Sequence, residues 1–289
     1  MPELPEVESI KLQLEKYLVG HKVEKVEIKH PKIFTGDPKK IEGAKLKAIR
    51  RFGKALCFDL DNGYSILSHI KLTGQFIYRG PNLKKPPVLS KKVVDGISGK
   101  HTHVIFNLDK GGKLYYNDVR RFGWIKIEKT SEVENESFIS RLGPEPFGSA
   151  QGKPGLLTFD YFKTICGKTK RAVKVLLMDQ SKMGGVGNIY ANDALWDARI
   201  DPKHPANSLS DTELKTLFKS IEKVLKKGLE TGGASELAFV TPDGTEGSYQ
   251  DHTLVYGKEG NVCKNCKENK IEKYMLGGRG TYWCPTCQN

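Results

Sequence analysis

The chain has 289 residues, and 47 Lys and Arg against 34 Asp and Glu give it a formal net charge of +13. A surplus of this size favours a polyanionic partner, nucleic acid before an anionic membrane surface. No apolar run approaches the ~18 residues that cross a bilayer, and the acidic N-terminus lacks an apolar signal core. We therefore expect a cytoplasmic protein (nucleoid-associated if bacterial) without secretion or membrane signals.

The chain begins MPELPEVE. Removal of Met1 would leave Pro2 with a free secondary amine, which can attack an aldehyde carbon of a sugar and form an iminium. Glu3 follows directly and could move the protons that this chemistry needs. Apolar positions at helical spacing predict a helix over Pro5–Leu18. The alternative, which these eight residues alone favour, is that Pro5 merely starts that helix and Pro2 has no chemical role.

Short alternating segments follow, separated by glycine-containing turns, and they predict an antiparallel sandwich or barrel. The clearest predicted strands are 54–60, 64–70, 103–108 and 124–128. Residues 80–100 contain Gly-Pro, Pro-Pro and several lysines. They predict an exposed, mobile loop.

Three places in this strand-rich region could contact DNA. Lys54 is either a phosphate contact or a solvated surface lysine. His69 could donate to a phosphate, although a lone histidine is more often structural. In the loop 118–123, which reads DVRRFG, the ring of Phe122 could wedge between bases while a guanidinium bonds an orphaned base. A solvated turn with one buried phenylalanine is the alternative.

The second half of the chain has a helical pattern. A glycine- and proline-rich segment, 142–155, separates it from the first half and is typical of an interdomain linker. Two short helices are expected within 158–180 and another over 188–198. A capping box of Ser210 and Glu213 then starts a long helix that runs to about residue 230.

The turn Gly184–Asn188 leads into one of these helices. A dinucleotide site would need a strand before the turn, and the preceding segment has a helical pattern instead. The backbone amides and the Asn188 side chain could hold a DNA phosphate within a helix-turn-helix element. A plain turn between two helices remains the alternative.

Four of the six cysteines form two CxxC pairs near the C-terminus, with seventeen residues between the pairs. Two pairs at this spacing indicate a tetrahedral zinc site more strongly than a redox motif. A site closed by four thiolates has no open position, so one structural Zn²⁺ is expected. The basic, aromatic segment between the pairs favours a two-stranded ribbon that could bind a DNA groove. The predicted ligands are Cys263, Cys266, Cys284 and Cys287.

Together these motifs resemble the formamidopyrimidine-DNA glycosylase/endonuclease VIII family of base-excision repair enzymes over nearly the whole chain. The resemblance rests on PELPEVE, the second RRFG (120–123), LGPEP (142–146), the helix–two-turn–helix signature (180–191) and the zinc finger, in family order. PELPEVE resembles the formamidopyrimidine branch.

The resemblance implies an α+β multidomain fold. An N-terminal antiparallel β-sandwich with a flanking helix would be followed by a helix–two-turn–helix domain and a β-ribbon zinc finger. The implied boundaries are 1–147 for the catalytic domain, 148–155 for the linker, 156–250 for the DNA-binding domain with its lesion-recognition loop, and 251–289 for the zinc finger.

The resemblance further implies a bifunctional DNA glycosylase and DNA-(apurinic or apyrimidinic site) lyase that excises oxidised purines such as 8-oxoguanine and formamidopyrimidines. Pro2 would attack C1′ of the damaged nucleotide, Glu3 would donate and accept protons, and β- and δ-elimination would follow from the Schiff base. Glu6 matches a supporting carboxylate. The phosphate-holding positions are Lys54, His69, Asn188 and Arg279. Lys54 is also placed among the catalytic residues. The void-filling positions are Leu72, Arg120 and Phe122.

Two positions depart from the family pattern. Leu72 replaces the usual methionine, and the basic residue often found near Leu237, in the loop that covers the damaged base, is absent. Both keep open a preference for oxidised pyrimidines, as in the endonuclease VIII branch. A non-catalytic zinc-ribbon DNA binder and a scaffold protein are further alternatives. The expected partner is double-stranded DNA with oxidised bases or abasic sites, bound by a monomer and without membrane contact.

Overall fold

The structure is a computed structural model that describes residues 1–146 and 155–288. The chain forms two compact units: Met1–Ser140 with Leu229–Gln250, and Arg141–Gly228 with Asp251–Asn289. The stretch Leu229–Gln250 therefore groups with the first unit, whereas the sequence placed it in the DNA-binding domain. Except for Gly155, the predicted linker 148–155 lies outside the described residues. Within the described part, no helix combines the length and apolarity needed to cross a membrane.

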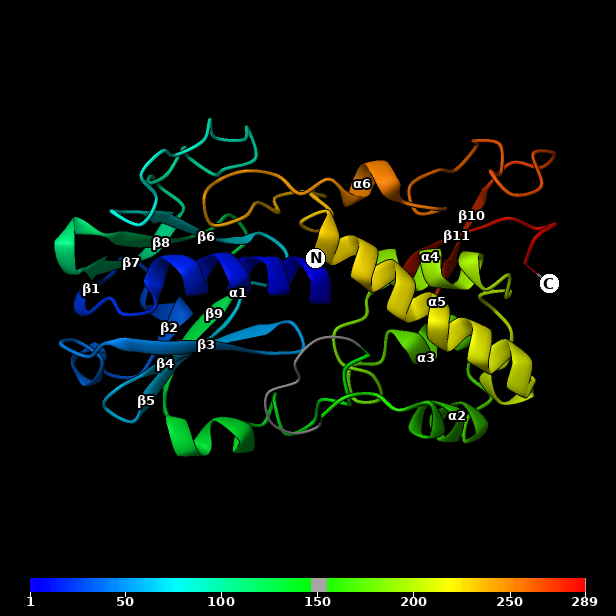
Figure 1. Ribbon diagram of the computed structural model, residues 1–289, viewed down its shortest axis with the longest axis horizontal. Helices are drawn as coiled ribbons and strands as arrows, with labels where there is room; N and C mark the ends of the chain where they lie inside the picture. Colours follow the sequence, from blue (N-terminus) through cyan, green and yellow to red (C-terminus); the bar gives the residue numbers. More distant parts are fainter. Residues whose placement is uncertain (147–154, 289) are drawn as a thin grey trace. The chain divides into compact units, whose positions relative to one another are not determined.

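The first unit is a sandwich of two sheets with helix α1 (Leu4–Leu18) lying along them (Figure 1). One sheet has the order β1-β7-β8-β6 and the other β2-β9-β5-β4-β3. All neighbouring strands pair antiparallel except β2 and β9. The strands are β1 Val23–Ile28, β2 Phe34–Thr35, β3 Leu46–Phe52, β4 Ala55–Leu60, β5 Tyr64–His69, β6 Gly74–Arg79, β7 Thr102–Leu108, β8 Lys113–Asp118 and β9 Trp124–Lys129.

This architecture confirms the predicted sandwich with its flanking helix. The four strands singled out from the sequence are present as β4, β5, β7 and β9, with ends within one residue or so of the expected ones. Short 3-10 helices connect several elements: Pro31–Ile33, Pro38–Lys40, Asp109–Gly111, Thr130–Asn135 and, in the second unit, Ala206–Ser208.

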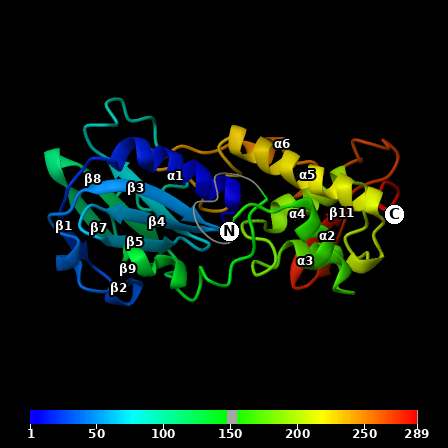
Figure 2. The same cartoon turned by 60° about the horizontal axis from the view of Figure 1, so that its bottom comes forward.

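The rest of the chain is mainly helical, as predicted (Figures 1 and 2). The predicted capping box is present, because Ser210 N donates to Glu213 Oε2 at 2.7 Å and Glu213 N donates to Ser210 Oγ at 3.3 Å. The helices are α2 Phe159–Gly167, α3 Val173–Leu177, α4 Asn188–Asp197, α5 Asp211–Glu230 and α6 Tyr249–His252, and a C-terminal hairpin is formed by β10 Glu272–Leu276 and β11 Arg279–Trp283.

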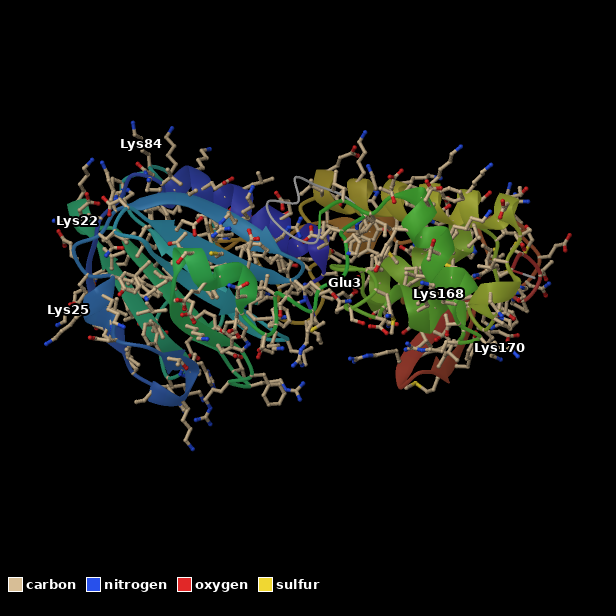
Figure 3. All side chains as sticks on the ribbon, turned by 90° about the horizontal axis from the view of Figure 1, so that it is seen from below. Glu3, Lys22, Lys25, Lys84, Lys168 and Lys170 are labelled. Atoms are coloured by element: carbon tan, nitrogen blue, oxygen red, sulfur yellow. The ribbon has the colours of Figure 1, made fainter. Side chains whose placement is uncertain are left out.

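Exposed lysines occur on both units. Figure 3 labels Lys22, Lys25 and Lys84 on the first unit and Lys168 and Lys170 on the second, and all five are exposed. Both units therefore present positive side chains that a polyanionic ligand can contact.

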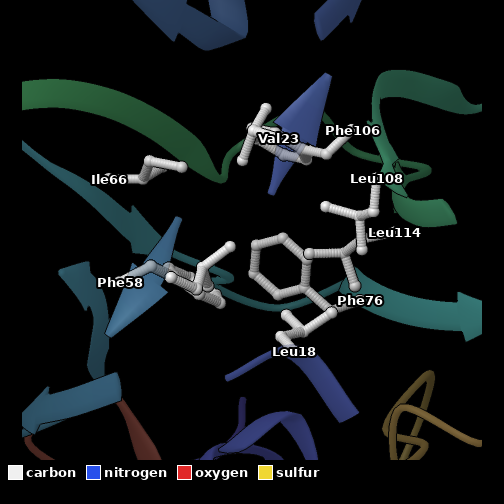
Figure 4. Close-up of a pocket in the computed structure, with 9 residues that line it drawn as sticks. Leu18, Val23, Phe58, Ile66, Phe76, Phe106, Leu108 and Leu114 are labelled. Carbon is white, nitrogen blue, oxygen red and sulfur yellow. The ribbon is translucent and has the colours of Figure 1, made fainter. Parts of the chain in front are cut away.

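The core of the first unit lies between its two sheets and the apolar face of α1. Val7, Ile10 and Leu14 recur at helical spacing and are at most 1% exposed. A cavity of about 10 Å³ remains within this core, lined by apolar side chains from both sheets and α1 (Figure 4). Because such a volume is at the lower limit for one water molecule, this cavity is a packing defect and not a ligand site.

The loop 80–100 is not fully exposed, which corrects the sequence prediction. Val93 is only 6% exposed and packs with Ile77 of β6 and Val240. Leu89 and Ile97 pack against the same cluster. The loop contains enough apolar side chains to form a small core of its own against the 229–250 stretch.

Candidate active site and nucleic-acid contacts

The N-terminus of α1 holds the predicted catalytic residues. Pro2 is buried, and Glu3 is the N-cap residue of α1. Glu6 Oε2 accepts a hydrogen bond from Glu3 N at 2.7 Å, which is one half of a capping box. Glu6 Oε1 accepts from Ala234 N at 2.7 Å, so one carboxylate joins the helix start to a distant loop. Glu3 and Glu6 are 3% and 1% exposed. The backbone that presents Pro2 is therefore held from two sides.

A buried ion pair connects α1 to the turn that carries Lys54. Arg51 Nε donates to Glu8 Oε2 at 2.6 Å, and Arg51 Nη1 donates to the carbonyl of Gly53 at 3.0 Å. The two charged side chains are 2% and 9% exposed. This pair is not evident from the sequence. Its partners lie 43 residues apart, and no local pattern relates residues at that separation.

Lys54 and His69 are each 4% exposed, which excludes the solvated-lysine interpretation of Lys54. His69 Nδ1 accepts a hydrogen bond from Lys71 N at 3.0 Å, so in the neutral ring Nε2 carries the proton. Burial, and then the positive charges of Lys71 and Lys54, lower the pKa of His69 to about 3. At neutral pH, His69 can therefore donate one neutral hydrogen bond but carries no charge.

The RRFG loop presents an arginine and an aromatic ring together. Phe122 is 53% exposed, and the guanidinium carbon of Arg120 lies 4.6 Å from the centre of its ring. The buried carboxylate of Asp118 anchors the loop, because it accepts from Gly123 N at 2.8 Å and from Arg120 N at 3.2 Å. The phenylalanine is thus not the buried ring of a plain solvated turn.

The Leu72 loop is tied to the same anchor. Thr73 Oγ1 donates to Asp118 and accepts from Arg120 N at 3.1 Å. Leu72 itself is half-buried. The structure thus joins the two loops that carry the three predicted void-filling residues through one threonine and one aspartate, neither of which the sequence analysis singled out.

In the second unit, the side chain of Gln180 organises the glycine-rich turn before Asn188. Gln180 Nε2 donates to the carbonyl of Val186 at 2.7 Å, and its Oε1 accepts from Gly185 N at 3.0 Å. Asn188 is the first residue of α4 and is half-buried. The turn follows helix α3, as the sequence predicted, so the backbone before α4 has the geometry of a helix–turn–helix element.

The four predicted metal ligands lie together. Their Sγ atoms are all within 4.8 Å of one another, and both Cys263–Cys287 and Cys266–Cys284 are 3.7 Å apart. A disulfide would require about 2.05 Å. A tetrahedral site with Zn–S bonds of ~2.3 Å has S–S edges of about 3.8 Å. The cluster therefore fits a closed four-thiolate metal site.

The hairpin that carries Arg279 is fixed to the helices of its unit. Lys174 is fully buried in α3, and its Nζ donates to the Gly280 carbonyl at 2.9 Å and to Thr281 Oγ1 at 2.7 Å. Tyr282 N donates to the side-chain oxygen of Asn192 of α4 at 2.8 Å. Arg279 is exposed at the start of β11. A buried lysine that serves the hairpin was not predictable from the sequence pattern.

The chain matches two family models. The formamidopyrimidine-DNA glycosylase N-terminal domain matches residues 1–125, and the formamidopyrimidine-DNA glycosylase H2TH domain matches residues 142–239. A formamidopyrimidine-DNA glycosylase of Listeria innocua is 38% identical over 294 residues, which cover 100% of both proteins.

Solved structures of the Lactococcus lactis enzyme are similar as well. Its complex with DNA containing N7-benzyl-Fapy-dG has a TM-score of 0.85, with 31% identity and 99% of each chain covered. Its complex with DNA containing an abasic site has a TM-score of 0.84, again with 31% identity and 99% of each chain covered.

Proposed function

The chain belongs to the formamidopyrimidine-DNA glycosylase family and is a DNA glycosylase of base-excision repair, and we propose that Pro2 and Glu3 are its catalytic pair. The substrate class that we propose is double-stranded DNA with oxidised purines or abasic sites. The Lactococcus lactis relative binds a formamidopyrimidine lesion and an abasic site, which supports this choice.

The proposed reaction begins with eversion of the damaged nucleotide, because the glycosidic carbon is not accessible inside a duplex. The Pro2 nitrogen bonds to C1′ while the glycosidic bond breaks, and the base departs with the bonding pair and takes up a proton. Sugar ring opening, with proton transfer through Glu3, leaves an iminium at C1′. Loss of a C2′ proton then expels the 3′ phosphate, a second elimination expels the 5′ phosphate, and water releases the sugar remnant from Pro2.

The observation that carries this proposal is the buried carboxylate of Glu6, which accepts two hydrogen bonds. It holds Glu3 N with one carboxylate oxygen and Ala234 N with the other. A nucleophile must be held by a rigid structural support if it is to reach a carbon with the correct geometry. We propose that Glu6 provides this support without touching the substrate.

We propose that Lys54, His69, Asn188 and Arg279 hold DNA phosphates around the lesion. Leu72, Arg120 and Phe122 then fill the space that the everted nucleotide vacates. The cost of unstacking is a few kcal/mol, which inserted side chains and phosphate contacts can offset. We further propose that the protein acts as a monomer in the cytoplasm, and that the four-cysteine cluster holds one structural Zn²⁺.

Borohydride trapping on an 8-oxoguanine:C duplex, with mass spectrometry of the adduct, tests the catalytic assignment. Borohydride reduces the iminium, so we expect DNA covalently attached at Pro2, and Pro2→Gly should trap far less. Adducts only on an oxidised-pyrimidine duplex would keep the chemistry and change the specificity. If protein with a confirmed free Pro2 gives no adduct on any lesion, the assignment is wrong.

A further inference from the structure

The loop 80–100 and the stretch 231–247 of the first unit are held together by polar contacts. Lys92 Nζ donates to the Ser235 carbonyl at 2.6 Å and to Glu246 Oε2 at 2.7 Å. Ser90 N donates to the Gly244 carbonyl at 2.9 Å. One lysine thus binds the stretch near its beginning and near its end.

A buried glutamine of β6 completes the connection. Gln75 is 1% exposed, and its Nε2 donates to the carbonyls of Lys92 at 2.7 Å and Ala238 at 2.6 Å. Its Oε1 accepts from Val94 N at 3.0 Å. The polar atoms of this amide are all used to join the two loops, and the small apolar cluster around Val93 packs beside them.

The loops also fit closely in shape. Gly244 has a φ of +94°, and a Cβ atom there would lie 2.3 Å from Leu89 Cδ2. A side chain at this position would therefore force the Leu89 side chain to move. We call the contacts of Gln75 and Lys92 the brace.

The stretch 231–247 also contacts the candidate active site, near its beginning. Ala234 N donates to Glu6, and the carbonyl of Ser235, the next residue, accepts a hydrogen bond from Lys92. A Cβ atom on Gly233 would lie 2.8 Å from Glu6 Cγ, so backbone and carboxylate are in direct contact. Lys92 and Glu6 therefore hold two adjacent residues of one backbone segment, Ser235 and Ala234.

Between the two braced carbonyls, the chain adopts a strained conformation. Leu237 has a φ of 53° and is 65% exposed. Left-handed backbone is unfavourable for a leucine and persists where surrounding contacts impose it. The carbonyls of Ser235 and Ala238, held by Lys92 and Gln75, lie on either side of this residue in the chain. Everted bases are commonly gripped by apolar side chains, and Leu237 offers one.

We propose that Lys92 and Gln75 are positioning residues that fix the 233–238 segment beside Glu6 before the substrate binds, so that Leu237 is presented to the everted base. This inference rests on the proposed function. A segment ordered in advance loses less entropy on binding. The brace should therefore matter for excision of a base and much less for cleavage at an abasic site, which has no base to contact.

Lys92→Met tests the brace, because methionine keeps most of the chain length and removes both polar contacts. Lys91→Met, at the exposed neighbouring position, is the matched control, and Lys92→Arg is the conservative variant. Hydrogen exchange of the DNA-free proteins should show faster exchange of amides in 231–247 for Lys92→Met alone. Single-turnover excision of 8-oxoguanine should slow about 10- to 100-fold, cleavage of an abasic duplex should change less than about threefold, and Lys92→Arg should restore part of the excision rate.

Wild-type exchange and excision in Lys92→Met would overturn the proposal. Equal losses on both duplexes, with a lower melting temperature, would overturn it too, because they indicate a general folding defect. If the wild-type protein acts on neither duplex, the proposed function is wrong and the base-positioning role fails with it. The exchange measurement does not depend on activity and still decides whether Lys92 orders the loop.

Discussion

At the scale of single residues, Glu3 and His69 show how burial decides what a side chain can do. Glu3 lies at the helix start with its backbone held by Glu6. His69 lies among aromatic rings, with Trp124 and Phe138 at centroid distances of 6.2 and 5.2 Å. The surroundings of Glu3 fix its carboxyl group in place, and the surroundings of His69 keep its imidazole neutral.

Glu3→Gln should slow base excision by at least about 100-fold, because glutamine retains the shape of the side chain but cannot transfer a proton. Affinity for a lesion duplex should stay within about threefold of wild type, since phosphate contacts supply most of the binding. Single-turnover excision and fluorescence anisotropy measure the two quantities. Glu24→Gln, at an exposed position of β1, is the control, and normal turnover by Glu3→Gln would refute the assigned role.

His69 should make the protein less stable in acid. Its pKa of about 3 in the folded state lies below the unfolded value of about 6.5. Its contribution is therefore complete above pH 6.5 and is lost as the pH falls from 6.5 towards 3. By linkage, wild type should lose about 2 kcal/mol more than His69→Gln between pH 7.5 and pH 5. Urea unfolding at the two pH values checks this, with the exposed His252→Gln expected to behave like wild type.

At the scale of elements, the buried pair of Glu8 and Arg51 fixes helix α1 to the β3–β4 turn. Arg51→Met should lower the free energy of unfolding by about 3–5 kcal/mol, because it leaves a buried carboxylate without its main partner. The double variant Glu8→Gln/Arg51→Met should recover part of this loss. Lys163→Met breaks the exposed pair with Asp211, whose side chains are 48% and 61% exposed, and should cost less than about 1 kcal/mol. Equal losses of unfolding free energy in Arg51→Met and Lys163→Met would contradict the assignment of Glu8 and Arg51 as a buried, stabilising pair.

The C-terminal hairpin should depend on its metal. We expect one zinc ion per chain in elemental analysis, and chelation should unfold the hairpin because structural zinc sites contribute directly to folding. Near-ultraviolet circular dichroism would follow this through Tyr282 and Trp283, whose neighbours include the ligand Cys284. The first unit should keep its own signal, and a hairpin that stays intact without metal would refute a structural role.

The sequence predicted features whose cause is local. Helix α1 follows from apolar spacing, the Ser210 cap from its partner three residues on, and the thiolate cluster from two CxxC pairs. It did not predict contacts between distant residues, such as Glu6 with Ala234, 228 positions apart. No periodicity encodes such pairs, because they depend on how finished elements pack. For the same reason, the assignment of 229–250 to the first unit was visible only in the structure.

At the scale of the whole molecule, the net charge of +13 should dominate the salt dependence of DNA binding. Of the four proposed phosphate-holding residues, only Lys54 and Arg279 bring a positive charge and release counterions. Lys54→Met and Arg279→Met should each reduce the slope of log K against log salt by about 1. Asn188→Ala should weaken binding at every salt concentration with the slope unchanged. Anisotropy titrations between about 50 and 200 mM KCl measure these slopes, and identical slopes for all three variants would contradict the assignment.

The first unit is assembled from two segments that the chain encodes far apart, and this has a consequence during synthesis. Glu6 leaves the ribosome early, but its partner Ala234 is 228 residues behind. At about 5–20 residues per second, the N-terminal segment waits on the order of 10–45 s for that contact. A nascent chain interrupted before residue 234 therefore lacks a supported N-terminus, so truncated translation products should not nick the genome that the finished enzyme repairs.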